Sequence, residues 1–270
     1  MSSRHAWRYV TFDATGTLLR PAECLGKTYL NFWKAASGQS LSSSRYAAAV
    51  AALTSQFPTE FSLLSRSNPN FGSDSKTTSA FLWWRQLVLN VMKRAKVVDC
   101  LAHNEEQVER FMRNLYAHFA RPEAWMVFED VKPTLERLVA MKVPIGVISN
   151  FDERLESLLV GLKLRDYFQV VTTSFGQPQM KPHASIFQST FKQLQTEEEP
   201  VVASKFLHVG DHLSRDFKAA KDIGAQARLL WRTKHPPPPN DINANEVIAT
   251  LHDVVAEKQV NEVEALLTAW

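Results

Sequence analysis

The sequence predicts an α/β protein in which a doubly wound parallel sheet is interrupted by an inserted helical segment. Five short runs rich in Val, Ile and Phe alternate with turns and amphipathic stretches, as strands and helices of a parallel sheet do. The first two runs are separated by far more residues than a crossover between parallel strands needs. That long gap contains helix-compatible runs and no convincing strand, which predicts a separate helical domain.

The five predicted strands are short and apolar, as expected for strands that are buried on both faces of a parallel sheet. They are Arg8–Asp13, Val143–Asn150, Phe168–Ser174, Phe206–Asp211 and Ala227–Trp231. Amphipathic stretches such as residues 134–139 and 155–159 lie between them and predict helices. We therefore assign residues 1–20 and 126–270 to the α/β core domain.

Residues 21–125 are assigned to the inserted helical domain. Its helix-compatible runs are Tyr46–Leu53, Phe81–Lys96 and Glu105–His118. An insert directly after the first strand is expected to lie over the carboxyl ends of the strands, where open α/β folds bind ligands.

Composition and charge exclude several classes of protein. The chain is 45% apolar and 22% charged, which is typical of a globular protein rather than a disordered chain or a coiled coil. The net charge of +3 is too small to indicate a nucleic-acid partner, and no apolar run reaches the roughly 18 residues that span a bilayer. The predicted first strand leaves no room for a removable signal, and Cys24 and Cys100 have no metal-ligand spacing. We expect a cytoplasmic protein with reduced thiols; the oligomeric state is not indicated.

The first candidate motif, Asp13-Ala14-Thr15-Gly16-Thr17, follows the first predicted strand. A carboxylate fixed at a strand end acts as a nucleophile when its target is activated. A following glycine lets backbone amides approach an anion closely. A turn capped by an ordinary structural aspartate fits the same five residues taken alone.

Two further motifs follow later strands. Ser149 and Asn150 end the second strand, where a hydroxyl and backbone N–H groups bind a phosphoryl oxygen or simply open the next helix. Lys181 precedes Pro182, which we place in the first turn of a helix that begins near His183. A lysine fixed there offsets charge on a nucleophile and a phosphate, although a solvent-facing lysine is an alternative.

The fourth motif surrounds the end of the fourth strand. Asp211 ends the strand and Asp216 begins the next helix, so two carboxylates flank one tight turn. This arrangement suits a hard cation such as Mg²⁺, whereas Asp216 alone is equally explained by the helix dipole. We interpret His208 as a core residue. His212 lies beside the acids, where it could contact a substrate, but loop positions of this kind are usually solvated. The four motifs occur in order at the carboxyl ends of parallel strands, and this joint arrangement is specific.

Together these motifs resemble those of the haloacid dehalogenase-like (HAD) hydrolase superfamily. Asp13–Thr17 resembles its first motif, Ser149 its second, Lys181 its third, and Gly210-Asp211 with Asp216 its fourth. The resemblance implies a Rossmannoid HAD-like core with the family's C1-type helical cap inserted over residues 21–125. Three further segments resemble one subgroup of the family: residues 148–156, residues 70–72 and the pair Trp83-Trp84.

The resemblance also implies roles for these residues in a Mg²⁺-dependent phosphatase that acts on a small phosphorylated metabolite. Asp13 would attack phosphorus and become an aspartyl phosphate, with Lys181 as a catalytic and phosphate-holding group. The remaining implied phosphate ligands are Thr17, Ser149 and Asn150. The implied metal ligands are Asp13, the backbone carbonyl of Thr15, Asp211 and Asp216.

Thr15 departs from the family pattern, because phosphatases of the family carry there an Asp that serves as general acid and base. General acid–base help is worth roughly 10²–10⁴-fold in rate, so the expected phosphohydrolase is slow. P-type ATPases, with Asp-Lys-Thr-Gly-Thr, and phosphonatases also lack this acid. The 2-haloacid dehalogenases, with Asp-x-Tyr-Gly-Thr, need no metal and lack the Gly-Asp-x₄-Asp arrangement. Two alternatives stay open: a binding or regulatory protein without turnover, and a metal-independent dehalogenase.

Overall fold

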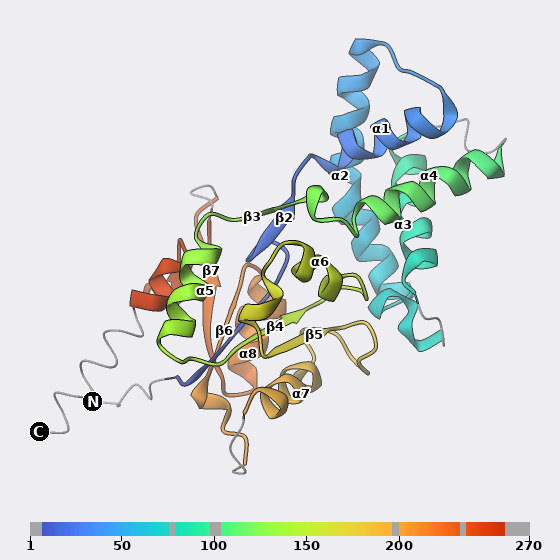
Figure 1. The fold of residues 1–270 in the computed structure, drawn as a ribbon. Helices are drawn as coiled ribbons and strands as arrows, with labels where there is room; N and C mark the ends of the chain where they lie inside the picture. Colours follow the sequence, from blue (N-terminus) through green and yellow to red (C-terminus); the bar gives the residue numbers. More distant parts are fainter. Residues whose placement is uncertain (1–6, 76–78, 98–103, 196–199, 233–235, 257–270) are drawn as a thin grey trace, which may run out of the picture. The chain divides into compact units, whose positions relative to one another are not determined.

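The computed structural model describes residues 7–75, 79–97, 104–195, 200–232 and 236–256, which form two compact units (Figure 1). The core unit comprises the residues through Arg20, Val127–Phe151 and the residues from Leu162 onward. The helical unit comprises Pro21–Met126 and Asp152–Gly161. The chain passes between the units in β2 (Leu19–Pro21) and β3 (Trp125–Val127), which pair as a two-stranded sheet. Cys24 is an exposed free thiol, and Cys100 lies outside the described residues.

The core unit contains a six-stranded sheet in the order β5-β4-β1-β6-β7-β8, and every pairing is parallel. Its strands are β1 (Tyr9–Phe12), β4 (Ile145–Ser149), β5 (Val170–Thr173), β6 (Phe206–Gly210), β7 (Gln226–Leu230) and β8 (Val247–Ile248). The predicted α/β class and all five predicted strands are confirmed, with ends that differ by one or two residues. The sequence did not predict β8, because two residues are too short to show a periodic pattern.

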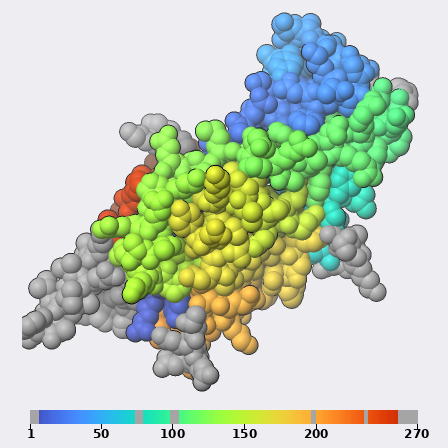
Figure 2. All heavy atoms as spheres, viewed as in Figure 1, coloured from blue at the N-terminus to red at the C-terminus, as the bar shows by residue number. Residues whose placement is uncertain are grey.

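Helices cover both faces of this sheet. Right-handed crossovers put α5 (Val131–Ala140) on one face, and α7 (Ala184–Leu194) with α8 (Ala219–Asp222) on the other (Figure 1). The buried residues of α5 recur at helical spacing, as Val131, Leu135 and Leu138. Its other side is exposed, with both charged and apolar residues, and forms part of the surface seen in Figure 2.

Aromatic packing fixes α7 against the sheet. The ring of Phe191 in α7 stacks on that of Phe206 in β6 at 4.0 Å, and Phe206 stacks on Tyr9 in β1 at 4.5 Å. Such offset pairs add about 0.5–1.5 kcal/mol each to the energy of burial. Because Lys181 lies just before α7, this packing also determines where the third motif is held. The helix begins after its N-cap residue, His183, so Pro182 precedes the cap rather than lying in the first turn as predicted.

The helical unit consists of α1 (Leu25–Ser37), α2 (Ser43–Ser67), α3 (Phe81–Arg94), α4 (Glu105–His118) and α6 (Leu155–Gly161). The predicted run Tyr46–Leu53 lies within α2, the run Phe81–Lys96 extends two residues beyond the end of α3, and α4 has the predicted bounds. The sequence did not indicate α1, which contains glycine, threonine and several aromatic residues of modest helix propensity. Packing of Tyr29, Leu30 and Trp33 compensates, because all three are buried. No helix among the described residues is long and apolar enough to cross a membrane.

Residues 152–161 group with the helical unit, although the sequence assigns them to the core. The reason is a set of polar contacts. Asp152 accepts a hydrogen bond of 2.6 Å from the indole N–H of Trp84, and Glu153 accepts one of 3.2 Å from the backbone N–H of Ala80. The guanidinium of Arg154 lies 3.8 Å from the ring centre of Tyr116. Trp83 is buried and Trp84 is partly exposed, and the indole N–H of Trp83 donates instead to the carbonyl of Asn68 at 2.8 Å.

Candidate functional site

Asp13 lies immediately after β1, at the centre of the sheet. Its backbone N–H donates to the carbonyl of Val209 in β6 at 2.9 Å, which brings the ends of the two strands together. The loop then turns at Gly16 with φ of +89°, and a Cβ there would lie 2.0 Å from Oδ2 of Asp211. Only glycine fits this position, because both the backbone conformation and the close approach exclude a side chain.

Lys181 is the polar centre of the site. Its buried ammonium donates to Oδ1 of Asp13 at 2.7 Å, to Oδ1 of Asp216 at 2.5 Å and to the carbonyl of Ile148 at 2.7 Å. Burial alone would lower the pKa of Lys181, but the two carboxylates outweigh it and raise the pKa. The lysine is therefore a fixed positive charge shared by Asp13 and Asp216.

Asn150 holds the backbone of Lys181 in place. Its amide group donates to the carbonyl of Lys181 at 2.8 Å, and its amide oxygen accepts from the N–H of Lys181 at the same distance. Asn150, predicted as a phosphate ligand, thus has both polar atoms engaged in positioning the lysine. Ser149 is buried at the end of β4, one residue earlier.

Three carboxylates meet at this edge of the sheet. Asp13, Asp211 and Asp216 each offer an oxygen, and these oxygens all lie within 4.8 Å of one another. Partial burial, followed by the negative charges of Asp13 and Asp216, raises the pKa of Asp211 to about 7. Burial acts in the same direction on Asp216, but the charge of Lys181 and the contact with His208 outweigh it and hold its pKa well below the usual range. This concentration of hard oxygen ligands suits a divalent cation such as Mg²⁺.

The turn before Asp216 is built for close packing. The backbone N–H of His212 donates to Oδ2 of Asp216 at 3.0 Å. A Cβ at Gly210 would lie 2.3 Å from the carboxyl carbon of Asp216, so the strand end passes directly against that side chain. The ring of His212, which we interpreted as a possible substrate contact, accepts through Nδ1 from the N–H groups of Ser214 and Arg215 and caps the following helical turn.

The two threonines of the first motif differ in environment. Thr15 is exposed, and its side chain makes no hydrogen bond to another described residue. Thr17 is fully buried, yet its hydroxyl has no hydrogen-bond partner among the described residues. A buried hydroxyl without a partner is costly, so Thr17 has an unused donor in the loop that begins at Asp13.

Sequence reasoning missed a clamp on this loop formed by Arg232 and Asp130. Arg232 donates to the carbonyl of Thr17 at 2.9 Å and to both carboxylate oxygens of Asp130 at 2.7 and 3.0 Å. Leu251 donates its backbone N–H to the same carboxylate at 2.8 Å. No local pattern marks these residues, because the two charged partners are 102 positions apart.

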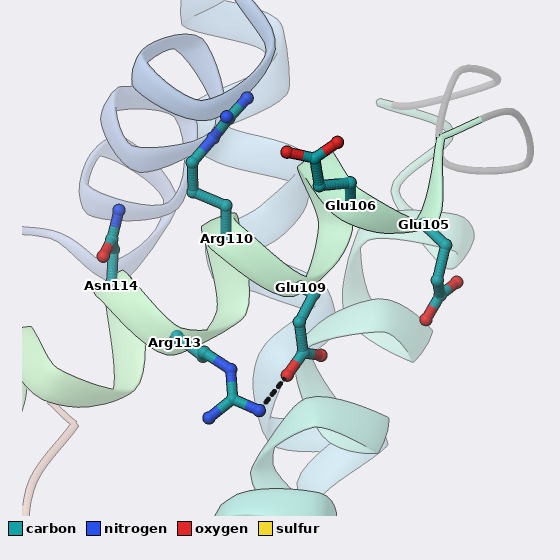
Figure 3. Close-up of a pocket in the computed structure, with 6 residues that line it drawn as sticks. All are labelled: Glu105, Glu106, Glu109, Arg110, Arg113 and Asn114. Carbon is teal, nitrogen blue, oxygen red and sulfur yellow. Dashed lines mark ion pairs between the residues drawn. The ribbon is translucent and has the colours of Figure 1, made fainter.

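A second group of charged side chains lines a groove along α4 in the helical unit (Figure 3). They are Glu105, Glu106, Glu109, Arg110, Arg113 and Asn114. Several of these charges are already paired: Arg113 with Glu109 at 2.6 Å, and Arg85 with Glu105 at 2.5 Å. Among the described residues, the groove contributes none to the one possible metal-ligand cluster, which is formed by Asp13, Asp211 and Asp216.

Comparison with known proteins agrees with this geometry. A family model described as haloacid dehalogenase-like hydrolase matches residues 7–224. Haloacid dehalogenase-like hydrolase domain-containing protein 3 of Danio rerio is 30% identical over 254 residues, which cover 94% of this chain and 97% of the relative. The Homo sapiens protein of that name is 34% identical over 230 residues, covering 85% and 84%. The resemblance inferred from the sequence is thereby confirmed.

More distant matches include both phosphatases and dehalogenases. A glyceraldehyde 3-phosphate phosphatase of Methanocaldococcus jannaschii is 28% identical over 123 residues, covering 45% of this chain and 52% of that protein. A HAD phosphatase from Thermococcus onnurineus has a TM-score of 0.58 and 23% identity, covering 93% of this chain and 97% of its own. A 2-haloacid dehalogenase from Pseudomonas syringae has a TM-score of 0.61 and 20% identity, covering 94% and 98%. These two solved structures share the fold, which does not by itself choose between the two reactions.

Proposed function

The chain belongs to the haloacid dehalogenase-like hydrolase family, and on this premise we propose that it is a Mg²⁺-dependent phosphohydrolase that acts through Asp13 on a small phosphorylated molecule. One observation carries the proposal. The Lys181 ammonium is shared by Asp13 and Asp216, with Asp211 beside them. A nucleophile, a fixed positive charge and a set of hard oxygen ligands are the parts that phosphoryl transfer to a carboxylate requires.

The proposed reaction has two steps. A carboxylate oxygen of Asp13 forms a bond to phosphorus, and the bond from phosphorus to the leaving oxygen breaks, with its electron pair going to that oxygen. The leaving oxygen takes a proton from water, because Thr15 has none to give at neutral pH. Water then attacks phosphorus and gives up a proton to the solvent, which neutralises the hydroxide left by the first step. The bond to the Asp13 oxygen breaks with its electron pair returning to the carboxylate, and inorganic phosphate leaves.

The surrounding residues have supporting roles in this proposal. Lys181 orients Asp13 by holding Oδ1 and offsets the charge of the phosphoryl group. Ser149 and the unpartnered hydroxyl of Thr17 donate to phosphoryl oxygens. Asn150 contributes indirectly, since it fixes the backbone of Lys181. The helical unit takes the place of the C1-type cap, because its main segment follows the first motif in the chain.

The residues present fit Mg²⁺, which prefers a few carboxylate oxygens together with water and phosphate. Asp13, Asp211 and the carbonyl of Thr15 would hold it, with Asp216 in support. When bound, the ion supplies positive charge that offsets the negative charge of the phosphoryl group and of the clustered carboxylates. Metal-independent dehalogenation would leave Asp211 and Asp216 without a role, so we rank it below phosphoryl transfer.

Phosphate release from a panel of phosphomonoesters tests the proposal. We expect slow release that requires Mg²⁺ and disappears in Asp13→Asn, whose amide cannot act as the nucleophile. Equal release from Asp13→Asn would refute it. Metal-free chloride release from a 2-chloro acid would instead support dehalogenation. If the protein binds beryllium fluoride with Mg²⁺ but releases no phosphate from any ester, the site is a binding site without turnover.

A further inference from the structure

His208 lies in the middle of β6, directly behind the acidic cluster, and is fully buried. Its Nε2 faces Oδ1 of Asp216 at 3.4 Å, and its Nδ1 lies 2.9 Å from the hydroxyl of Thr11 in β1. The rings of Phe187 and His208 pack edge to face, with their centres 5.1 Å apart, and this contact fixes the plane of the imidazole. The histidine is thus held on three sides and points at one carboxylate.

The partners of the ring determine where its protons lie. Asp216 also accepts a hydrogen bond from Lys181, so its carboxylate is ionised and only accepts. Nε2 of His208 must therefore carry a hydrogen. Burial favours the neutral imidazole, and in that form Nδ1 accepts from the Thr11 hydroxyl at 2.9 Å. This contact is shorter than the 3.4 Å between the same hydroxyl and the carbonyl of Leu207. The hydrogen bonds then run in one direction, from Thr11 to His208 to Asp216.

We propose that His208 is a positioning residue, which Thr11 orients and which holds the carboxylate of Asp216 in the place where it supports Lys181 and the metal site. The inference rests on the proposed function, because it assigns a role within the same site. Oδ1 of Asp216 is held by Lys181 and His208, and Oδ2 by the backbone N–H of His212. Removal of the imidazole frees one side of this carboxylate, while Asp13 and Asp211 keep their positions.

Mg²⁺ affinity, measured by calorimetry on the metal-free protein, tests this role without any substrate. We expect His208→Leu to weaken binding about tenfold, the lower end of the range for residues that support metal ligands. His208→Gln, which keeps an N–H near Nε2, should restore most of the affinity. Thr11→Val keeps the shape of the threonine and should weaken binding severalfold. Thr134→Val is the matched control, because Thr134 is equally buried, lies on α5 and has no partner for its hydroxyl.

The second measurement is the ¹⁵N NMR spectrum of the histidine rings, which needs no metal. A protonated Nε2 of His208 supports the inference, and an unprotonated Nε2 overturns it. The inference is also overturned if His208→Leu and Thr11→Val both bind Mg²⁺ with wild-type affinity. It is overturned as well if His208→Gln binds Mg²⁺ no more tightly than His208→Leu. A wild-type protein without Mg²⁺ binding would refute both proposals. Mg²⁺ binding that depends on His208, without phosphate release, would refute the proposed function alone.

Discussion

At the scale of single residues, Thr15 limits the rate of the proposed phosphohydrolase. Its side chain is exposed and cannot ionise, while Asp13, Lys181 and the acidic cluster are assembled around it. The step that lacks an evident catalyst is proton transfer, both to the leaving group and from the attacking water. Nucleophilic attack by Asp13 does not need position 15, so the substitution slows turnover without removing the site.

Thr15→Asp is therefore predicted to raise the rate of phosphate release at least tenfold, since general acid–base catalysis contributes roughly 10²–10⁴-fold. Thr15→Asn introduces a side chain of the same size as aspartate but without a titratable proton, so it should not increase the rate. The measurement is the turnover number with saturating Mg²⁺ and one phosphomonoester. No gain in Thr15→Asp would mean that another group already activates water.

At the scale of secondary-structure elements, the ion pair of Asp130 with Arg232 joins the start of α5 to the end of β7. Burial opposes ionisation of Asp130, but the hydrogen bonds from Arg232 and Leu251 outweigh it and lower its pKa. The unfolded chain, with an ordinary carboxyl pKa of about 3.9, binds this proton more readily than the folded one. The stabilisation is complete above that pH and is lost as the pH falls towards the lower folded pKa.

Asp130→Asn should lower the free energy of unfolding by about 2 kcal/mol at pH 7, because Arg232 loses a charged partner while it remains partly buried. The difference from wild type should shrink below about pH 4. Urea denaturation at several pH values measures both effects. Asp241→Asn is the control, since its pair with Lys218 is exposed and exposed pairs contribute at most about 1 kcal/mol. A loss that does not vary with pH would contradict this account.

A second ion pair anchors the element that contains α6. Arg154 is bidentate to the buried Asp152, with bonds of 2.8 and 2.6 Å. Arg154→Met leaves that carboxylate buried without its partner, so we expect a loss of about 3 kcal/mol or more in the free energy of unfolding. Arg113→Met, in the exposed pair with Glu109, should cost less than about 1 kcal/mol. If both variants lost the same free energy of unfolding in thermal or urea melts, burial would not determine how much each ion pair contributes.

At the scale of the whole molecule, folding brings together the three carboxylates of the core unit, and a bound cation would offset their repulsion. Mg²⁺ that binds only the folded protein stabilises it, by about 2.7 kcal/mol at a concentration 100 times the dissociation constant. We predict that the melting temperature rises with Mg²⁺ concentration and that chelation reverses the rise. Asp211→Asn should melt higher than wild type without metal, because one negative charge is removed, and should respond little to Mg²⁺. A full Mg²⁺ response in this variant would place the ion elsewhere.

The division of the chain into two units was only partly predictable from the sequence. The strands and the helices of the insert follow local periodicity. The sequence therefore predicted the strand ends to within two residues and the bounds of α4 without error. Residues 152–161 were not separable from the core in this way. Their amphipathic pattern is the same whichever surface they pack on. Hydrogen bonds from the side chains of Trp84 in α3 and Tyr116 in α4 hold them on the helical unit.

By itself the sequence determined the α/β class, the parallel strands and the order of the motif residues at or beyond their ends, which are Asp13, Ser149, Lys181 and Asp211. These features follow from short-range sequence patterns. Only the tertiary structure decided that Lys181 is shared by two carboxylates, that Arg232 contacts the Asp13–Thr17 loop, and that His208 contacts Asp216. The physical reason is distance along the chain. The bonds of Lys181 to Asp13 and of Arg232 to Thr17 join residues more than a hundred positions apart and leave no local periodicity. Burial, which makes such bonds strong, exists only after the sheet has formed.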